Sequence, residues 1–161
     1  MNRIMVIGCP GSGKSTFSKK LHQITKLPLF HLDMMYWNAD KTVVDKEVFK
    51  ERLYNTIQLD KWIIDGNYSS TIELRLQACD TVIFLDYPFD VCLEGIRARK
   101  GKKRTDIPWV ENEDDMEFLE FVKNYNFQSR PNVIGLLEKY SNKSIYIFKD
   151  RKAENDFLSN L

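Results

Sequence analysis

A short segment near the N-terminus constrains this chain more than any other part of it. Residues 8–15 read Gly-Cys-Pro-Gly-Ser-Gly-Lys-Ser, which matches the spacing G-x-x-x-x-G-K-[S/T] at every fixed position. The segment follows an apolar run, residues 3–7, and precedes residues 14–26, where apolar side chains recur at helical spacing. A glycine-rich turn between a buried strand and an amphipathic helix is the setting in which this motif binds phosphate groups.

The fixed residues of this phosphate loop each have a chemical role. The glycines let the backbone curl so that successive N–H groups face one anion, and the start of the following helix adds the positive end of its dipole. We expect Lys14 to reach the β- and γ-phosphates of a nucleotide and the Ser15 hydroxyl to ligate Mg²⁺.

The rest of the chain alternates apolar runs of strand length with segments of helical period. Strands are expected at residues 3–7, 28–32, 62–64, 81–85 and 144–148, and helices at 14–26, 45–59, 89–100 and 116–140, with a break near Pro131 and a short helix after the last strand. Strands separated by helices form a parallel sheet covered on both faces. We therefore predict a three-layer α/β fold in a single domain spanning residues 1–161.

Acidic residues end three of these predicted strands, at Asp33, Asp65 and Asp86. The carboxyl ends of parallel strands meet at the edge of the sheet where ligands bind. We expect Asp65 to hold Mg²⁺, directly or through a water, and Asp33 to orient an acceptor hydroxyl or take its proton. A turn or cap role is the alternative for each, and it is the favoured interpretation of Asp86.

The densest basic segment covers the end of the predicted helix 89–100 and the start of a polar stretch, residues 101–115, that we predict to be a lid or insert. Phosphoryl transfer needs positive charge around the moving group, so Arg97 and Arg104 are candidate catalytic residues beside Lys14. A solvated run of charge or a nucleic-acid patch are the alternatives.

The sequence offers only a few candidates for residues that contact the phosphoryl acceptor. Tyr36 and Trp37 follow Asp33 and either stack on a flat acceptor or pack beneath a loop. Arg75 is a candidate on the acceptor side and Arg130 a candidate that returns from the lid, although surface salt bridges would explain both.

The composition excludes several classes of protein. The net charge is +1, from 24 basic and 23 acidic side chains, so we expect no direct binding to nucleic acid and none to anionic membranes. No apolar run approaches the ~20 residues of a membrane span, and residues 4–7 are too short for a signal peptide. The three cysteines lack CxxC spacing, which favours reduced thiols and a cytoplasmic protein.

A resemblance to a known family adds to these interpretations. The residues that carry it are the loop Gly8–Thr16, His31-Leu32-Asp33 with Trp37, Trp62-Ile63-Ile64-Asp65-Gly66-Asn67-Tyr68, Arg75, Asp80 and Leu85-Asp86. In these segments the chain resembles the adenylate-kinase-related P-loop proteins called DNA topology modulation proteins (FlaR-type). The resemblance covers most of the first hundred residues and implies the nucleoside-monophosphate-kinase architecture, with five parallel strands in the order 2-3-1-4-5 and a mobile lid.

The resemblance also implies ligands and an activity. It implies ATP and Mg²⁺ at the phosphate loop, whose candidate residues are Gly8, Pro10, Gly11, Ser12, Gly13, Lys14, Ser15 and Thr16. Adenylate kinases carry Thr-Gly-Asp after the second strand and Asp-Gly-Phe-Pro-Arg after the third. Here those places read His-Leu-Asp and Asp-Gly-Asn-Tyr, so the arginine of the second motif is absent unless Arg75 replaces it, and AMP is not favoured as the acceptor.

Two functional hypotheses follow. The first is a kinase, monomeric as is usual for this shape, that transfers the γ-phosphoryl group of ATP-Mg²⁺ to a small nucleotide, nucleoside or metabolite. The second is a nucleotide-dependent regulatory or DNA-topology-associated module with little kinase activity. A GTPase is not favoured, because the chain has no Asn-Lys-x-Asp guanine motif.

Overall fold

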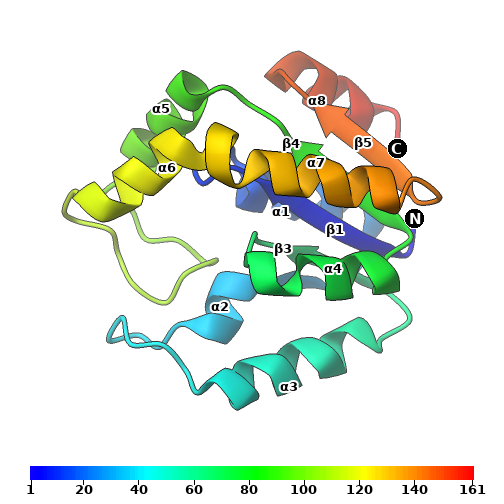
Figure 1. Cartoon of the computed structure of the whole chain (residues 1–161), viewed down its shortest axis with the longest axis horizontal. Coiled ribbons are helices and arrows are strands. Elements are labelled where there is room, and N and C mark those ends of the chain that lie inside the picture. The colour runs from blue at the N-terminus through cyan, green and yellow to red at the C-terminus, as the bar shows by residue number, and fades with distance from the viewer.

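The centre of the molecule is a five-stranded parallel sheet with the strand order β2-β3-β1-β4-β5 (Figure 1). A computed structural model describes the whole chain, residues 1–161. The strands are β1 (Arg3–Gly8), β2 (Leu29–His31), β3 (Trp62–Asp65), β4 (Thr81–Leu85) and β5 (Ser144–Phe148). The predicted α/β class, parallel sheet and strand order are confirmed.

Helices cover both faces of this sheet, with α4 and α7 in front of it and α1 behind it in Figure 1. They are α1 (Lys14–Thr25), α2 (Leu32–Tyr36), α3 (Lys46–Ile57), α4 (Ser69–Ala78), α5 (Phe89–Arg99), α6 (Met116–Gln128), α7 (Arg130–Lys139) and α8 (Arg151–Ser159). None of them combines the length and the apolar character that a membrane crossing requires.

Two apolar cores lie on opposite faces of the sheet, because successive side chains of a strand point to opposite sides. In β1, Ile4 and Val6 pack into the core that contains α1 and α8, whereas Met5 and Ile7 pack into the core that contains α3, α4 and α7. All four side chains are fully buried. Burial on both faces explains why β1 is a continuous apolar run and not an alternating one.

The structure corrects the sequence prediction at two elements. Strand β2 ends at His31, so Asp33 lies in the first turn of the short helix α2 and not at the end of a strand. Helix α4 was not predicted, because its inward face is Ile72 and Leu76 with a buried arginine, Arg75, between them. The predicted break near Pro131 is confirmed, since α6 ends at Gln128 and Pro131 lies in the first turn of α7, where proline is tolerated.

The two faces of helix α1 allow a test of this packing. Leu21 is completely buried in the core, whereas Ile24 on the same helix is 45% exposed. We expect Leu21→Ala to lower the free energy of unfolding by about 2–5 kcal/mol, because it leaves a cavity in a packed core. Ile24→Ala is the matched control and should change it by about 0.5 kcal/mol or less. Urea unfolding monitored by circular dichroism measures both, and equal effects would contradict the placement of α1.

Candidate functional site

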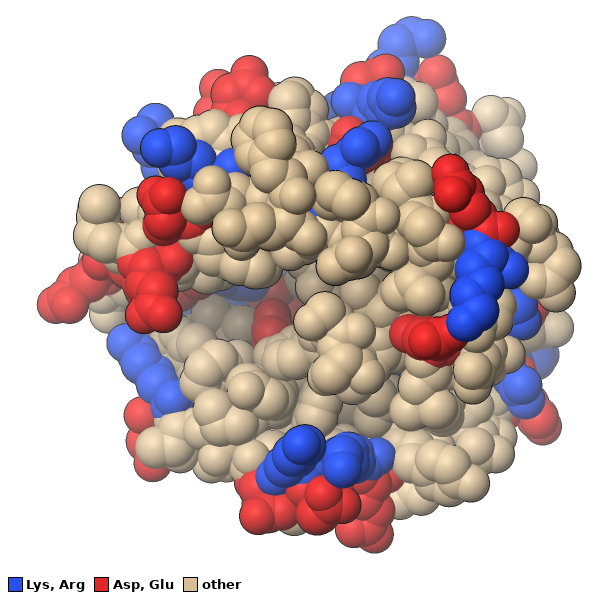
Figure 2. Space-filling view, viewed as in Figure 1, with Lys and Arg blue, Asp and Glu red and all other residues tan.

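A cleft opens beyond the carboxyl ends of the central strands, and Figure 2 shows it as a hollow between the α6 and α2 regions. Its lining comes from the phosphate loop, α2, the segment after β3, the end of α5, residues 100–115 and the start of α6. The cavity volume is about 1360 Å³, which exceeds the roughly 300–1,000 Å³ of a pocket for one small molecule. The cleft therefore has room for a nucleotide and a second small ligand.

The phosphate loop connects β1 to α1 and depends on its glycines. Gly11 and Gly13 have φ values of 84° and 92°, in the left-handed region that glycine adopts without strain. A Cβ atom on Gly11 would collide with the carbonyl of Cys92 in α5, and one on Gly95 of α5 would collide with the carbonyl of Gly11. At Gly13 a Cβ atom would come within 2.7 Å of the guanidinium of Arg151. The loop thus packs directly on α5 and leaves room for an arginine at the start of α1.

Lys14 lies at the centre of this loop. Its ammonium Nζ donates hydrogen bonds to the carbonyl oxygens of Gly8, at 2.9 Å, and Cys9, at 3.2 Å. Burial lowers the pKa of Lys14, and the nearby carboxylates of Asp33 and Asp65 act in the opposite direction. The curled backbone with a cation at its centre fits the phosphate groups of a nucleotide.

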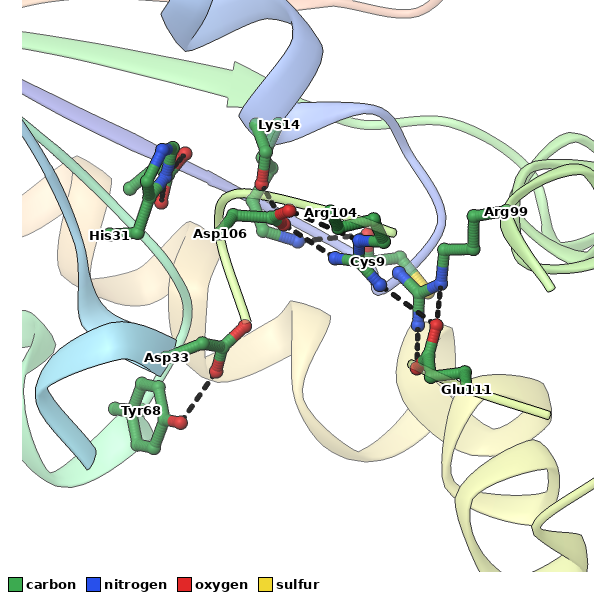
Figure 3. A network of polar contacts seen from close by, with 11 residues as sticks. Cys9, Lys14, His31, Asp33, Tyr68, Arg99, Arg104, Asp106 and Glu111 are labelled. Carbon is green, nitrogen blue, oxygen red and sulfur yellow. Dashed lines mark hydrogen bonds and ion pairs between the residues drawn. The ribbon is translucent and has the colours of Figure 1, made fainter. Parts of the chain in front are cut away.

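Two carboxylates line the cleft on the side of β2 and β3. Asp65, at the end of β3, is buried, and both of its carboxylate oxygens lie 2.9 Å from Nδ1 of His31. Asp33 Oδ1 accepts a 2.6 Å hydrogen bond from the hydroxyl of Tyr68 (Figure 3). Burial raises the pKa of Asp33, although the Tyr68 hydrogen bond and the charge of Lys14 act to lower it. A buried carboxylate with a raised pKa is a stronger base than one in water.

Residues 100–115 contain no helix or strand and cross the cleft as a loop. Ser15 Oγ donates a 2.6 Å hydrogen bond to Oδ2 of Asp106, and Trp109 makes an edge-to-face contact with Trp37, with ring centroids 5.1 Å apart. The loop therefore contacts both the phosphate loop and the segment after α2.

The loop also contains an ion-pair network, which Figure 3 shows between the phosphate loop and α6. The guanidinium of Arg104 pairs with Asp106, and its Nη1 lies 2.8 Å from Oε2 of Glu111. Arg99, at the end of α5, donates to Oε1 of the same Glu111 at 2.9 Å. Two arginines beside the phosphate loop are thus held by carboxylates of residues 100–115.

The structure brings most of the predicted site residues into this cleft. Those that line it are Pro10, Gly11, Gly13, Lys14, Ser15, Thr16, Asp33, Trp37, Asp65, Arg97 and Arg104. Gly8 and Ser12 are buried within the phosphate loop. The structure does not bring Arg75 or Arg130 into the lining.

Arg75 and Arg130 both have structural partners elsewhere. The Arg75 side chain is completely buried and donates to the backbone carbonyls of Gly66 and Asn67, so it holds the turn after β3. Arg130 makes two hydrogen bonds to the carboxylate of Asp86, at 2.7 and 2.8 Å. Asp86, interpreted from the sequence as structural, therefore has an arginine partner at the start of α7.

Several residues in and beside the cleft were given no site role from the sequence. Those that line the cleft are Asn67, Tyr68, Arg99, Asp106, Glu111 and Arg151, and His31 lies behind them as the partner of Asp65. Arg151 follows β5 at the same edge of the sheet, so its position after a strand was a usable signal. Asp106 and Glu111 gave no such signal, because only the path of the loop across the cleft brings them to Ser15 and the arginines.

Asp33 provides a test of the electrostatics. Because burial raises its pKa in the folded state, ionised Asp33 opposes folding at neutral pH. We expect Asp33→Asn to raise the free energy of unfolding at pH 7 by about 0.5–2 kcal/mol, the gain typical of relieving a strained functional site. The difference should shrink as the pH falls through the folded-state pKa and vanish below the unfolded value of about 3.9.

Guanidinium unfolding at several pH values measures this difference. Asp60→Asn is the control, because the Asp60 side chain is 100% exposed and its replacement should leave the stability nearly unchanged at every pH. An Asp33→Asn variant less stable than the wild type at pH 7 would show that the Tyr68 hydrogen bond outweighs burial.

Comparison with known proteins supports the fold more than any one activity. No protein-family profile and no curated protein sequence matches the chain. Among solved structures, shikimate kinase from Bacteroides thetaiotaomicron is similar with a TM-score of 0.58 and 19% identity, over 99% of this chain and 95% of that one. Deoxyadenosine kinase from M. mycoides with bound dATP is similar with a TM-score of 0.56 and 18% identity, over 98% and 97%. The chain therefore shares its fold with this shikimate kinase and this deoxyadenosine kinase.

Proposed function

We propose that this chain is a kinase that transfers the γ-phosphoryl group of ATP-Mg²⁺ to a hydroxyl group of a small nucleotide, nucleoside or metabolite. The observation that carries the proposal is the placement of two opposite groups in one cleft. The phosphate loop with Lys14 lies on one side, and the half-buried carboxylate of Asp33, oriented by Tyr68, lies on the other. A phosphate-binding site that faces a general base is what phosphoryl transfer to a hydroxyl requires.

The donor side of the reaction belongs to the phosphate loop. Its backbone N–H groups and Lys14 hold the β- and γ-phosphates, while Ser15 and Asp65 form the magnesium side. The bound Mg²⁺ supplies charge neutralisation on the phosphate oxygens. The carboxylates and the hydroxyl that line the cleft are the hard oxygen ligands that Mg²⁺ prefers.

The acceptor side belongs to the segments after β2 and β3. Asp33 accepts the proton of the acceptor hydroxyl, and its raised pKa brings its basicity nearer to neutral pH. Trp37 lines the same part of the cleft and offers a face for a flat acceptor. Tyr68 holds the carboxylate in place through its 2.6 Å hydrogen bond.

The loop of residues 101–115 acts as the lid. With Arg97 at the end of α5 and Arg104 in the loop, it brings positive charge to the transferring phosphoryl group. Its contacts with Ser15 and Trp37 span the cleft, so its closure excludes water from the reacting groups.

The proposed family is the FlaR-type group of adenylate-kinase-related proteins, on the markers given by the sequence. In the basic segment after residue 96, Arg99, Lys100 and Arg104 are paired with acidic side chains of the same region, which leaves only Arg97, Lys102 and Lys103 for the DNA-associated alternative. A surface for the DNA backbone needs unpaired cations. DNA affinity that falls steeply with added salt would instead support that alternative.

A panel of acceptors tests the proposed activity. Purified protein with ATP-Mg²⁺ and each nucleotide, nucleoside or hydroxyl metabolite should release ADP above the background without acceptor for at least one class. Lys14→Ala should lower this release by at least about 100-fold, because a preorganised charge at the phosphates is lost. Lys20→Ala, an exposed lysine of the same helix, is the matched control and should retain it. Full turnover by Lys14→Ala would refute the assignment.

The role of Asp33 predicts a separate kinetic signature. Asp33→Asn keeps an acceptor for the Tyr68 hydroxyl but removes the base, so kcat should fall by about 10²–10⁴-fold. Affinity for ADP-Mg²⁺ should change little, because the phosphate loop is intact. Steady-state kinetics together with calorimetric titration of ADP separate the two effects. Loss of nucleotide binding with unchanged kcat would place Asp33 on the donor side instead.

A further inference from the structure

The loop that crosses the cleft brings a carboxylate to the one hydroxyl that the sequence motif assigns to the metal. Oδ2 of Asp106 lies 2.6 Å from Oγ of Ser15, and Asp106 is only 3% exposed. The hydrogen-bond partner of Asp65, by contrast, is His31. The carboxylate in direct contact with Ser15 thus comes from residues 100–115 and not from the end of a strand.

We propose that Asp106 is a metal-side residue of the closed site, which holds the Mg²⁺ of the bound nucleotide together with Ser15 and gives up Arg104 in exchange. This inference rests on the proposed function. It adds to the magnesium side a carboxylate that arrives only when the loop covers the phosphate loop. Asp65 keeps its place on the β3 side of the same cleft.

The charge state of Asp106 supports this assignment. The buried carboxylate of Asp106 pairs with the guanidinium of Arg104, and it accepts a hydrogen bond from the hydroxyl of Ser15. The group is therefore a buried anion at neutral pH, and a buried anion needs a cation beside it. Arg104 is that cation in the present structure. A hard divalent ion with a preference for carboxylate oxygen can replace it.

Arg104 can leave Asp106 without losing its last partner. Its Nη1 also pairs with Glu111 at 2.8 Å, and Glu111 is in turn held by Arg99. Arg104 can therefore stay tethered to Glu111 while the rest of its guanidinium turns from Asp106 toward phosphate oxygens. With Asp106 and Ser15 holding the metal, Arg104 would remain paired with Glu111 and could contact the phosphoryl group.

A purely repulsive role for Asp106 makes the opposite prediction. If the Asp106 carboxylate served only to accept the hydrogen bond of Ser15, its negative charge would compete with the phosphates of the nucleotide. Its removal would then tighten nucleotide binding by the same factor with and without metal. A metal-side carboxylate affects binding only when the metal is present. The dependence on Mg²⁺ therefore distinguishes the two roles.

Calorimetric titration of the full chain with ADP, once with excess Mg²⁺ and once with a chelator, tests the proposal. We expect Asp106→Asn, which keeps an acceptor for Ser15 but no charge, to weaken binding with Mg²⁺ by about 10-fold or more. Without metal its affinity should equal or exceed that of the wild type. Asp90→Asn, an exposed acid of α5 outside the cleft lining, should match the wild type in both conditions.

Each other result overturns the proposal. Equal affinities for Asp106→Asn and wild type, or tighter binding by the same factor in both conditions, would exclude a metal-side role. Thermal unfolding checks that Asp106→Asn is folded. If it is not folded, Asp106→Ser, which also removes the charge, replaces it and should give the same result. A wild type that binds no ADP at all would refute the proposed function as well, whereas normal Mg²⁺-dependent binding that is insensitive to Asp106 would refute this inference alone.

Discussion

The close contact between the backbone of the phosphate loop and helix α5 positions the rest of the site. Gly11 and Gly95 each leave out a Cβ atom that would collide with the backbone of the other segment. Because no side chain separates them, the loop and the helix approach more closely than ordinary packing permits. Arg97 and Arg99 in the last turn of α5 therefore end beside the phosphate loop, and residues 100–115 begin at the rim of the cleft.

Several charged side chains of the cleft are paired with opposite charges of the same cleft. Lys14 lies near Asp33 and Asp65, while Arg99 and Arg104 are held by Asp106 and Glu111. Such networks of partly buried charge contribute little net stability, since the cost of desolvation offsets much of the attraction between the ions. They do keep the cations and carboxylates of the cleft in defined places.

The sequence predicted the fold better than the site. The strands could be located because β1, β3 and β4 are buried on both faces and are therefore continuous apolar runs. Asp33 was placed one element too early, since the apolar Leu32 extends the strand pattern although it is buried as the first residue of α2. Arg75 looked like a candidate for an acceptor contact because nothing in a sequence tells a buried arginine that caps backbone carbonyls from an exposed one.

By itself, the sequence determined the phosphate loop and the parallel sheet, because both depend on local rules: glycines at fixed spacing before a lysine, and apolar runs of strand length between helices. The tertiary structure alone decided which charges meet. The pairs Ser15–Asp106, His31–Asp65 and Asp33–Tyr68 join residues 91, 34 and 35 positions apart. Their partners are chosen by the path of the loop and by the packing of elements around the cleft, and no periodicity of the sequence encodes these distances.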